Sequence, residues 1–303
     1  VIGQFNEYTV ITLAPPSSGG IILMQVLGMI NTFRLDKIGM NEPKSMTIMA
    51  EAEKIAFADR ATHFGDPDFY HVPEEALLSP KYLKSRAALI NPNLATPSER
   101  ISSGISAPKQ SEQTTHYSIA DKKGNVVSVT TSLNNNFGSK VVVGGAGFFL
   151  NSTMDDFSVK PGIPNMFGLT GSIANKVEPG KRMLSSMTPT IVLKNYKPFL
   201  ALGSPGGPMI CTTVFQVIAN RIIFGKTLEQ AVAAPRFHHQ WKPDELYIEK
   251  DKFSHEVLEA LRAAGYKLNE RTAIGAVDAI EILPDGSFIG VADPRGNDSA
   301  AGY

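Results

Sequence analysis

Short hairpin turns constrain the fold of this sequence more than any other feature. Residues 121–125, 195–197 and 284–286 contain Asn, Asp, Gly or Pro, and each segment separates two runs rich in β-branched and apolar residues. Such turns join antiparallel neighbours. Apolar residues with helical spacing precede and interrupt the hairpins, at about residues 19–34, 43–63 and 209–224. We therefore predict a layered α+β fold with largely antiparallel sheets and outer helices, rather than a doubly wound parallel sheet.

Composition excludes several classes of protein. Hydrophobic residues make up 43% of the 303 residues, which allows a sizeable core and excludes intrinsic disorder. The 29 basic residues balance the 29 acidic ones, so the chain is a poor candidate for binding nucleic acid or anionic membranes. The longest apolar stretch, residues 19–30, is too short to span a bilayer. The single cysteine, Cys211, excludes an internal disulfide and a cysteine-based zinc site, and we expect it to be buried.

A change of composition divides the chain after its first third. Residues 91–111 are rich in Pro, Ser, Gly and Lys and have no apolar period, so we expect an exposed linker that ends just before Gln113. The residue Thr114 begins a β-branched segment that is typical of a strand start. Cleavage between Gln113 and Thr114 would instead place the threonine hydroxyl beside an α-amine with a pKa of about 7.7–8.0, a suitable general base. The residues alone leave both interpretations open.

Two glycines and two histidines give weaker signals. Gly206 and Gly207 lie just before the helix predicted at residues 209–224. They fit a tight turn with positive φ angles, and they equally fit a nest of backbone N–H groups that binds an oxyanion at a helix start. His238 and His239 are adjacent, so their side chains diverge and make a poor metal-binding pair.

Two polar pairs in apolar surroundings complete the candidates. Asp155 and Asp156 follow a strand predicted at residues 148–151, and they are either solvated turn residues or place one carboxylate in a site. Ser185 and Ser186 lie between apolar residues, where hydroxyl groups need hydrogen-bond partners. Those partners are either backbone groups or a ligand carboxylate.

In combination, these motifs resemble those of the γ-glutamyltranspeptidase family. The resemblance covers nearly the whole chain and is carried by residues 15–20, 49–60, 65–69, 114–118, 151–157, 184–187, 203–207 and 234–241. It implies an N-terminal-nucleophile hydrolase with a four-layer αββα sandwich. It also implies a precursor that cuts itself into a large and a small subunit.

The resemblance implies that the cut falls between Gln113 and Thr114. Residues 114–303 would be the small subunit of 190 residues, and residues 1–113 the C-terminal part of the large subunit. The rest of the large subunit would be a partner N-terminal to this chain, and would carry an arginine that holds the substrate carboxylate. Because the chain begins at Val1, we expect a mature or processed piece. The family suggests a periplasmic, secreted or cell-surface location.

The resemblance also assigns four catalytic residues. Thr114 would be the nucleophile for both self-cleavage and γ-glutamyl transfer. The hydroxyl of Ser132 would assist it, in a position where the family has Thr. The backbone amides of Gly206 and Gly207 would form the oxyanion hole.

Five residues would bind the substrate by the same resemblance. Asn134 and Asp156 match positions that bind the α-amino group, with Asp156 supplying the charge. Ser185 and Ser186 match the residues that bind the α-carboxylate. Thr153 stands where a Gln or Glu usually contacts the amino group.

One further residue and one residue pair depart from the family pattern. Phe167 lies in a predicted lid loop, residues 161–175, where the family often has Tyr. Together with Thr153, this change is expected to loosen selectivity for glutamyl substrates. Pro208 and Met209 replace a common Ser-Arg pair after the glycines, and proline is compatible with a helix start.

The implied reaction is attack by Thr114 on the γ-amide of glutathione or a related compound. A γ-glutamyl ester forms on Thr114, and water or an acceptor amine resolves it, with no metal or organic cofactor. One alternative is an acylase of the same family that acts on glutaryl-β-lactams or poly-γ-glutamate, although Asp156 favours a substrate with an α-amino group. Another alternative is an inactive homologue that acts as a binding module.

Overall fold

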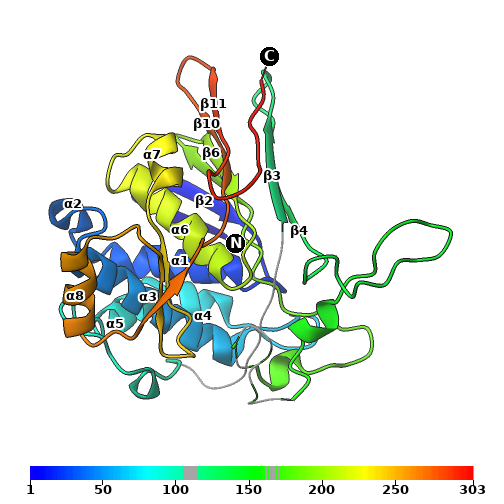
Figure 1. The fold of residues 1–303 in the computed structure, drawn as a ribbon, viewed down its shortest axis with the longest axis horizontal. Helices are drawn as coiled ribbons and strands as arrows, with labels where there is room; N and C mark the ends of the chain where they lie inside the picture. The colour runs from blue at the N-terminus through cyan, green and yellow to red at the C-terminus, as the bar shows by residue number, and fades with distance from the viewer. Residues whose placement is uncertain (105–114, 161–162, 164, 166–167, 170, 303) are drawn as a thin grey trace.

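The computed structural model describes residues 1–104, 115–160, 163, 165, 168–169 and 171–302 (Figure 1). Gln113, Thr114 and the lid residue Phe167 lie outside the described residues. The predictions that concern these three residues therefore stay predictions.

A six-stranded sheet forms the centre of the fold, in the order β1-β2-β5-β6-β10-β11. Every neighbouring pair in it is antiparallel. The hairpins predicted around residues 195–197 and 284–286 are confirmed as β5–β6 and β10–β11, whereas β1 was not predicted. The strands are β1 (Ile2–Phe5), β2 (Tyr8–Thr12), β5 (Thr190–Lys194), β6 (Lys197–Gly203), β10 (Asp278–Ile282) and β11 (Phe288–Val291).

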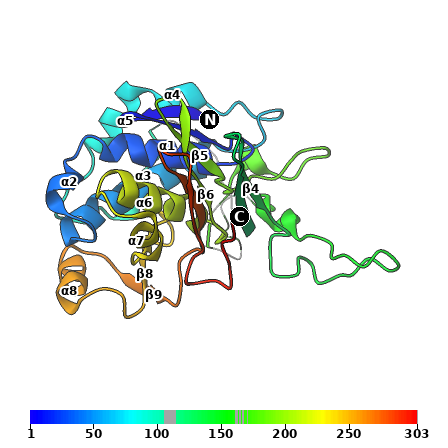
Figure 2. The ribbon, with the colours of Figure 1, turned by 90° about the horizontal axis from the view of Figure 1, so that it is seen from above.

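Helices cover one face of this sheet (Figures 1 and 2). The helix α1 (Gly19–Ile30) packs between α3 (Pro43–His63) and α6 (Met209–Ile222), and its apolar side chains are buried in the main core. Cys211 of α6 is buried, as predicted. The shorter helices are α2 (Leu35–Ile38), α4 (Glu74–Leu78), α5 (Pro80–Ala87), α7 (Leu228–Ala233) and α8 (His255–Ala263). None of the helices in the described ranges has both the length and the apolar content that a bilayer crossing requires.

The hairpin predicted around residues 121–125 lies against the other face of the sheet (Figure 1). It consists of β3 (Thr115–Ala120) and β4 (Val126–Thr131), and it packs on β6 and β10. The described residues therefore place helices, a six-stranded sheet and a two-stranded sheet in succession. The predicted mixed α+β fold with largely antiparallel sheets is confirmed.

A third, smaller sheet was not predicted. It contains β7 (Phe237–His238), β8 (Leu246–Glu249) and β9 (Leu268–Arg271). Its pair β8–β9 is parallel, with α8 in the connection. Strands of two to four residues are too short to show an alternating pattern in the sequence, which explains the omission.

Residues 91–104, the described part of the expected exposed linker, lie largely at the surface, with only Ser98 and Ile101 buried among them. Side chains of α3 hold this part in place: Lys54 donates to the Thr96 carbonyl at 2.7 Å, and the Gly104 N–H donates to Asp59 at 3.1 Å. The segment also forms a short 3₁₀ turn, η1 (Ser98–Arg100). Long-range hydrogen bonds order it, and such bonds leave no periodic signal in the sequence.

Two expectations differ from the structure. The predicted strand at residues 148–151 is absent, and only an isolated bridge joins Val142 and Phe149. Residues 133–150 project from the body of the fold (Figures 1 and 2), so their apolar side chains have no neighbouring strand to pair with. The first long helix ends at Ile30, before the predicted end at about residue 34.

Candidate active site

The strand that follows the predicted nucleophile is anchored at its first residues. Thr115, directly after Thr114, pairs with Thr131 in the β3–β4 ladder. The ring of His116 packs on the backbone of Gly203, so closely that a Cβ atom on Gly203 would overlap the imidazole. This contact brings the start of β3 to the end of β6, directly before the predicted oxyanion glycines.

The face of the β3–β4 hairpin that meets the central sheet is polar. The imidazole nitrogens of His116 are hydrogen-bonded to the Thr130 hydroxyl at 2.8 Å and the Ser118 hydroxyl at 3.0 Å. The Ser128 hydroxyl donates to the Leu202 carbonyl at 3.1 Å. Burial lowers the pKa of His116 to about 4, so this imidazole is neutral at pH 7.

The two glycines form a turn that other residues would adopt only with strain. Gly206 has a φ of 131° and Gly207 a φ of 59°. Pro208 follows as the N-cap of α6, which begins at Met209 as predicted. These angles account for glycine at both positions, and the oxyanion role remains a proposal.

Ser132 and Asn134 lie in one tight turn after β4. The Asn134 N–H donates to the Ser132 hydroxyl oxygen at 2.8 Å, and Asn134 has a φ of 71°. The side-chain N–H of Asn134 donates to the Ser152 carbonyl at 3.0 Å. Its Oδ1 atom is buried and accepts no hydrogen bond. An acceptor of this kind is available to a ligand that carries a hydrogen-bond donor.

Asp156 is the buried member of the acidic pair. It ends the 3₁₀ turn η2 (Thr153–Asp156) and is 3% exposed, whereas Asp155 is partly exposed. Burial, followed by the charge of Asp155, raises the pKa of Asp156 to about 8, and the charge of Arg60 opposes this rise. The Oδ1 atom of Asp156 has no hydrogen-bond partner. Of the two interpretations that the sequence left open, the burial of Asp156 excludes the one in which both acids are solvated.

Thr153 begins the turn that Asp156 ends, but its side chain bonds to another residue of its own loop. Its hydroxyl donates to the Asn151 side chain at 2.7 Å, and its N–H donates to the same oxygen. The hydroxyl is therefore engaged within its own turn.

A buried asparagine brings the acidic turn beside the two serines. The side-chain N–H of Asn175 donates to the Asp156 carbonyl at 2.7 Å, and its Oδ1 accepts from the Leu184 N–H at 2.9 Å. Leu184 directly precedes Ser185 and Ser186. Asn175 is thus a supporting residue that sequence reasoning missed, because a single asparagine in a loop carries no pattern.

Both serines are held by polar groups from the first third of the chain. The Ser185 carbonyl accepts from the Ser18 N–H at 2.6 Å. The Ser185 hydroxyl oxygen accepts from the Met187 N–H at 3.1 Å. The Ser186 hydroxyl oxygen lies 3.5 Å from a guanidinium nitrogen of Arg60. Sequence reasoning also missed Arg60. The adjacent charged residues Asp59 and Arg60, inside the helix predicted at residues 43–63, were a visible signal.

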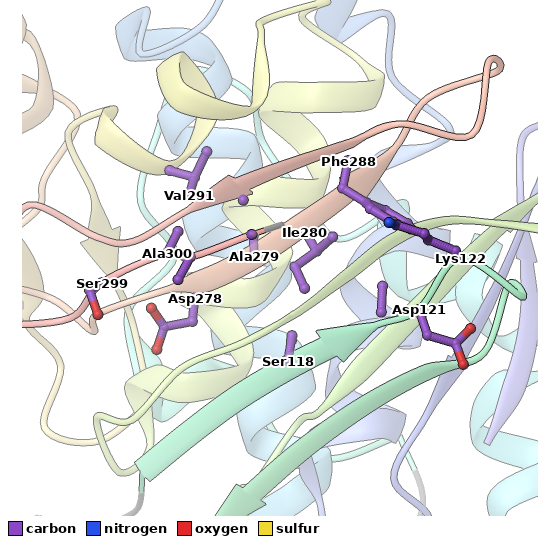
Figure 3. A pocket seen from close by; sticks show the side chains of 14 residues that line it. Ser118, Asp121, Lys122, Asp278, Ala279, Ile280, Phe288, Val291, Ser299 and Ala300 are labelled. Atoms are coloured by element: carbon purple, nitrogen blue, oxygen red, sulfur yellow. The ribbon is translucent and has the colours of Figure 1, made fainter.

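A partly open cavity lies elsewhere, between β3 and the β10–β11 hairpin, with a volume of about 340 Å³ (Figure 3). Ser118 and Asp278 lie on its facing strands, and residues 299–302 line one side. Burial, with the charges of Asp298 and Asp293, raises the pKa of Asp278 to about 6. No predicted site residue lines this cavity, so it is separate from the candidate site.

The part of the chain that the structure describes contains no group of three or more His, Cys, Asp or Glu side chains placed to hold a metal ion. His238 and His239 are instead buried among protein partners, with His238 bonded to Thr212 and Gln240.

Comparisons with known proteins identify the family of this chain. The family model described as gamma-glutamyltranspeptidase matches residues 1–303. The chain belongs to the γ-glutamyltranspeptidase family. It is 50% identical over 304 residues to a glutathione hydrolase proenzyme of Escherichia coli, covering 100% of this chain and 52% of that protein. The chain thus spans about half the length of the curated relatives it matches.

Solved structures of related proteins agree with this assignment. One similar structure is the Helicobacter pylori γ-glutamyltranspeptidase T380A mutant, with 54% sequence identity and a TM-score of 0.59. The match covers 60% of the present chain and 100% of the Helicobacter pylori chain. A cephalosporin acylase from Bacillus halodurans is 25% identical, with a TM-score of 0.84, and covers 100% of this chain and 52% of that chain.

Proposed function

We propose that the complete protein is a γ-glutamyltransferase and glutathione hydrolase with an N-terminal threonine nucleophile. The observation that carries the proposal is 50% identity over the whole chain to a glutathione hydrolase proenzyme. Hydrogen bonds that connect the loops of the candidate site support it. Asn134 donates to the Ser152 carbonyl directly before the Asp156 turn, and Asn175 joins that turn to the serine segment. The sequence resemblance and the contacts are independent kinds of support.

In this proposal Thr114 attacks the γ-amide of glutathione or a related compound. The developing oxyanion accepts hydrogen bonds from the amides of Gly206 and Gly207, and the Ser132 hydroxyl assists the nucleophile. Water or an acceptor amine then releases the γ-glutamyl group from the Thr114 ester. No organic cofactor or metal takes part.

The substrate's two charged groups would be held by different elements. Its ammonium group would contact Asn134 and Asp156, whose buried Oδ1 atoms lack partners. Its α-carboxylate would accept hydrogen bonds from Ser185 and Ser186. Thr153 would lie beside the ammonium site, where its engaged hydroxyl contributes less selectivity than a longer Gln or Glu side chain.

We also propose that residues 114–303 become the small subunit and that residues 1–113 end the large subunit. A separate chain in the H. pylori structure aligns over its whole length with 60% of this chain, which supports a division of this size. The remaining large-subunit part would be the partner, and a periplasmic, secreted or cell-surface location is expected.

The outer face of the β3–β4 hairpin supports a fourth layer in the complete protein. Tyr117, Ile119 and Val127 are 48%, 56% and 47% exposed, and Ile119 lies opposite Val127 in the ladder. The hairpin thus presents apolar side chains outward and polar ones inward, the reverse of a solvated sheet. We propose that helices of the remaining large-subunit part cover this face and complete an αββα sandwich.

The acylase alternative has support from the cephalosporin acylase structure, which shares the fold over the whole chain. A glutaryl side chain has no ammonium group, however, and would leave the buried Asp156 without a counter-charge. An inactive homologue would be recognised by an uncut chain.

Substitution of the nucleophile tests the proposal. Thr114→Ala should leave the protein uncut, because no hydroxyl remains to drive the N-to-O acyl shift. Thr115→Ala is the matched control and should still be cut, since it makes the same chemical change one residue later. Intact mass and N-terminal sequencing of the protein expressed from its complete coding sequence provide the measurement.

Two results would contradict this proposal. The first is a 190-residue fragment that begins at position 114 in the Thr114→Ala protein. The second is a wild-type protein that is correctly cut but releases no product from a γ-glutamyl anilide.

A further inference from the structure

A buried arginine lies behind the two serines of the candidate site. Arg60 is in the last turn of α3 and is 1% exposed. Its Nε atom donates to the Ser18 hydroxyl at 3.0 Å, and a terminal guanidinium nitrogen lies 3.5 Å from the Ser186 hydroxyl oxygen. Placing a guanidinium in the protein interior costs several kcal/mol unless other groups compensate its charge. Two groups of the site interact with this charge, the serine segment and Asp156.

Arg60 acts on the serine segment in two ways. The Ser18 hydroxyl accepts from Arg60 and donates to the Ser185 carbonyl at 2.9 Å, which fixes the backbone of the segment. The guanidinium also donates a hydrogen bond to the Ser186 hydroxyl oxygen. The Ser186 hydroxyl proton is then directed away from Arg60, and a charged donor strengthens the next hydrogen bond in such a chain.

Arg60 acts on Asp156 through its charge. Burial is the largest influence on Asp156 and favours the neutral carboxyl group, and the charge of Asp155 acts in the same direction. Among the described residues, Arg60 is the charged group that lowers the pKa of Asp156. An ionised Asp156 is the form that can hold a substrate ammonium group. Within the described part of the chain, the charged groups that act on this carboxylate are thus Asp155 on its own turn and Arg60 on α3.

We propose that Arg60 is a positioning residue of the substrate site, which orients the Ser186 hydroxyl and stabilises the ionised form of Asp156. The proposal rests on the assignments of Asp156 and Ser186 under the proposed function. It makes Arg60 a cation supplied by this chain itself, held behind the site by α3, and it explains why α3 carries a buried charge so close to two serines.

The pH profile of kcat/KM tests this proposal on the mature enzyme from the complete coding sequence. The charge of Arg60 opposes the rise in the pKa of Asp156, because a nearby opposite charge favours the ionised carboxyl group. Arg60→Gln should therefore move the acid limb of the profile to higher pH. It should also raise KM by roughly tenfold or more and change kcat much less. Rates are taken per titrated active site.

Two further variants separate positioning from a structural role. Arg60→Lys keeps the charge but loses the two-pronged geometry, so the acid limb should stay in place while KM rises. Arg86→Gln is the matched control, because Arg86 is a buried arginine that contacts Asp59 and the Ser102 carbonyl. It should lower the melting temperature without moving the acid limb.

The outcomes distinguish the proposals. An Arg60→Gln enzyme that is folded, with the wild-type acid limb and KM, would overturn the role of Arg60 alone. If Arg60→Gln does not fold, an unchanged KM in Arg60→Lys would overturn it. Asp156→Asn should abolish the limb. If it does not, the assignment of Asp156 under the proposed function is wrong, and the role of Arg60 falls with it.

Discussion

At the scale of single residues, two buried oxygen atoms define what the candidate site lacks. Asn134 Oδ1 and Asp156 Oδ1 are both inaccessible to solvent and accept no hydrogen bond. Leaving a buried acceptor unpaired costs about 1–3 kcal/mol. A ligand that brings hydrogen-bond donors recovers this free energy. In the proposed function, the substrate ammonium group supplies these donors.

Asp156→Asn tests this point through activity. The substitution keeps the size of the side chain and removes its charge. Hydrogen bonds to charged groups contribute about 1.5–3 kcal/mol, so kcat/KM on a γ-glutamyl anilide should fall roughly 10- to 150-fold above about pH 8, where the wild-type carboxylate is ionised. A variant within about twofold of wild type would exclude Asp156 from ammonium binding.

The same variant, although less active, should become more stable relative to wild type as the pH rises. The folded-state pKa of Asp156, about 8, lies above the unfolded value of about 3.9. The unfolded state therefore releases its proton first, and wild-type stability is lost as pH rises from about 4 to 8. Asn has no proton to lose. The melting temperature of Asp156→Asn relative to wild type should rise across this window, and an equal difference at pH 5 and pH 8 would contradict the assigned burial.

At the scale of elements, the contact between β3 and β6 fixes the strand that directly follows the predicted nucleophile. His116 packs where Gly203 has no side chain, and its ring is fixed by the hydroxyls of Ser118 and Thr130. The residue two positions before His116 is Thr114, so a shift of β3 would displace the predicted nucleophile. Gly203 has an ordinary φ angle, and glycine is needed here for space alone.

Gly203→Ala should therefore act through His116. The added Cβ would overlap the ring, and overpacking of this kind costs about 1–3 kcal/mol. The melting temperature and the extent of self-cleavage should both fall. Adding His116→Ala should recover part of the loss, because it removes the overlapping ring. Fully additive effects of the two substitutions would show that the two residues are not in contact.

At the scale of the whole molecule, the described chain leaves an apolar surface uncovered. The outer face of β3–β4 and the projecting residues 133–150 carry exposed apolar side chains, among them Phe148, 56% exposed. Contiguous apolar surface of this kind marks an interface. The large-subunit part outside this chain is the proposed cover.

Two substitutions of exposed apolar residues test this cover in the protein from the complete coding sequence. Ile119→Asp should destabilise it by roughly 2–5 kcal/mol, because the charge would be buried at the interface. Tyr196→Asp is the matched control, since Tyr196 is 93% exposed at the tip of the β5–β6 turn, and should change stability by less than about 0.5 kcal/mol. Equal melting temperatures for the two variants would show that nothing covers β3–β4.

Local chemistry made part of this protein predictable from its sequence. The three hairpins were predicted because their turn residues are adjacent in the chain and adopt conformations that few residues tolerate. The helical period also predicted residues 43–63, now α3, to the residue. The family, and through it the candidate site residues, followed from several ordered motifs that lie on local segments.

Only the tertiary structure decided which segments meet. Arg60 reaches Ser186 across 126 residues, and Asn175 joins two turns that the sequence shows as unrelated loops. Charged side chains of α3 likewise anchor Thr96 and Gly104 in the expected linker. Propensity and periodicity report on neighbours within a few positions, whereas the burial of Arg60 and the pKa of Asp156 depend on groups that chain folding alone brings together.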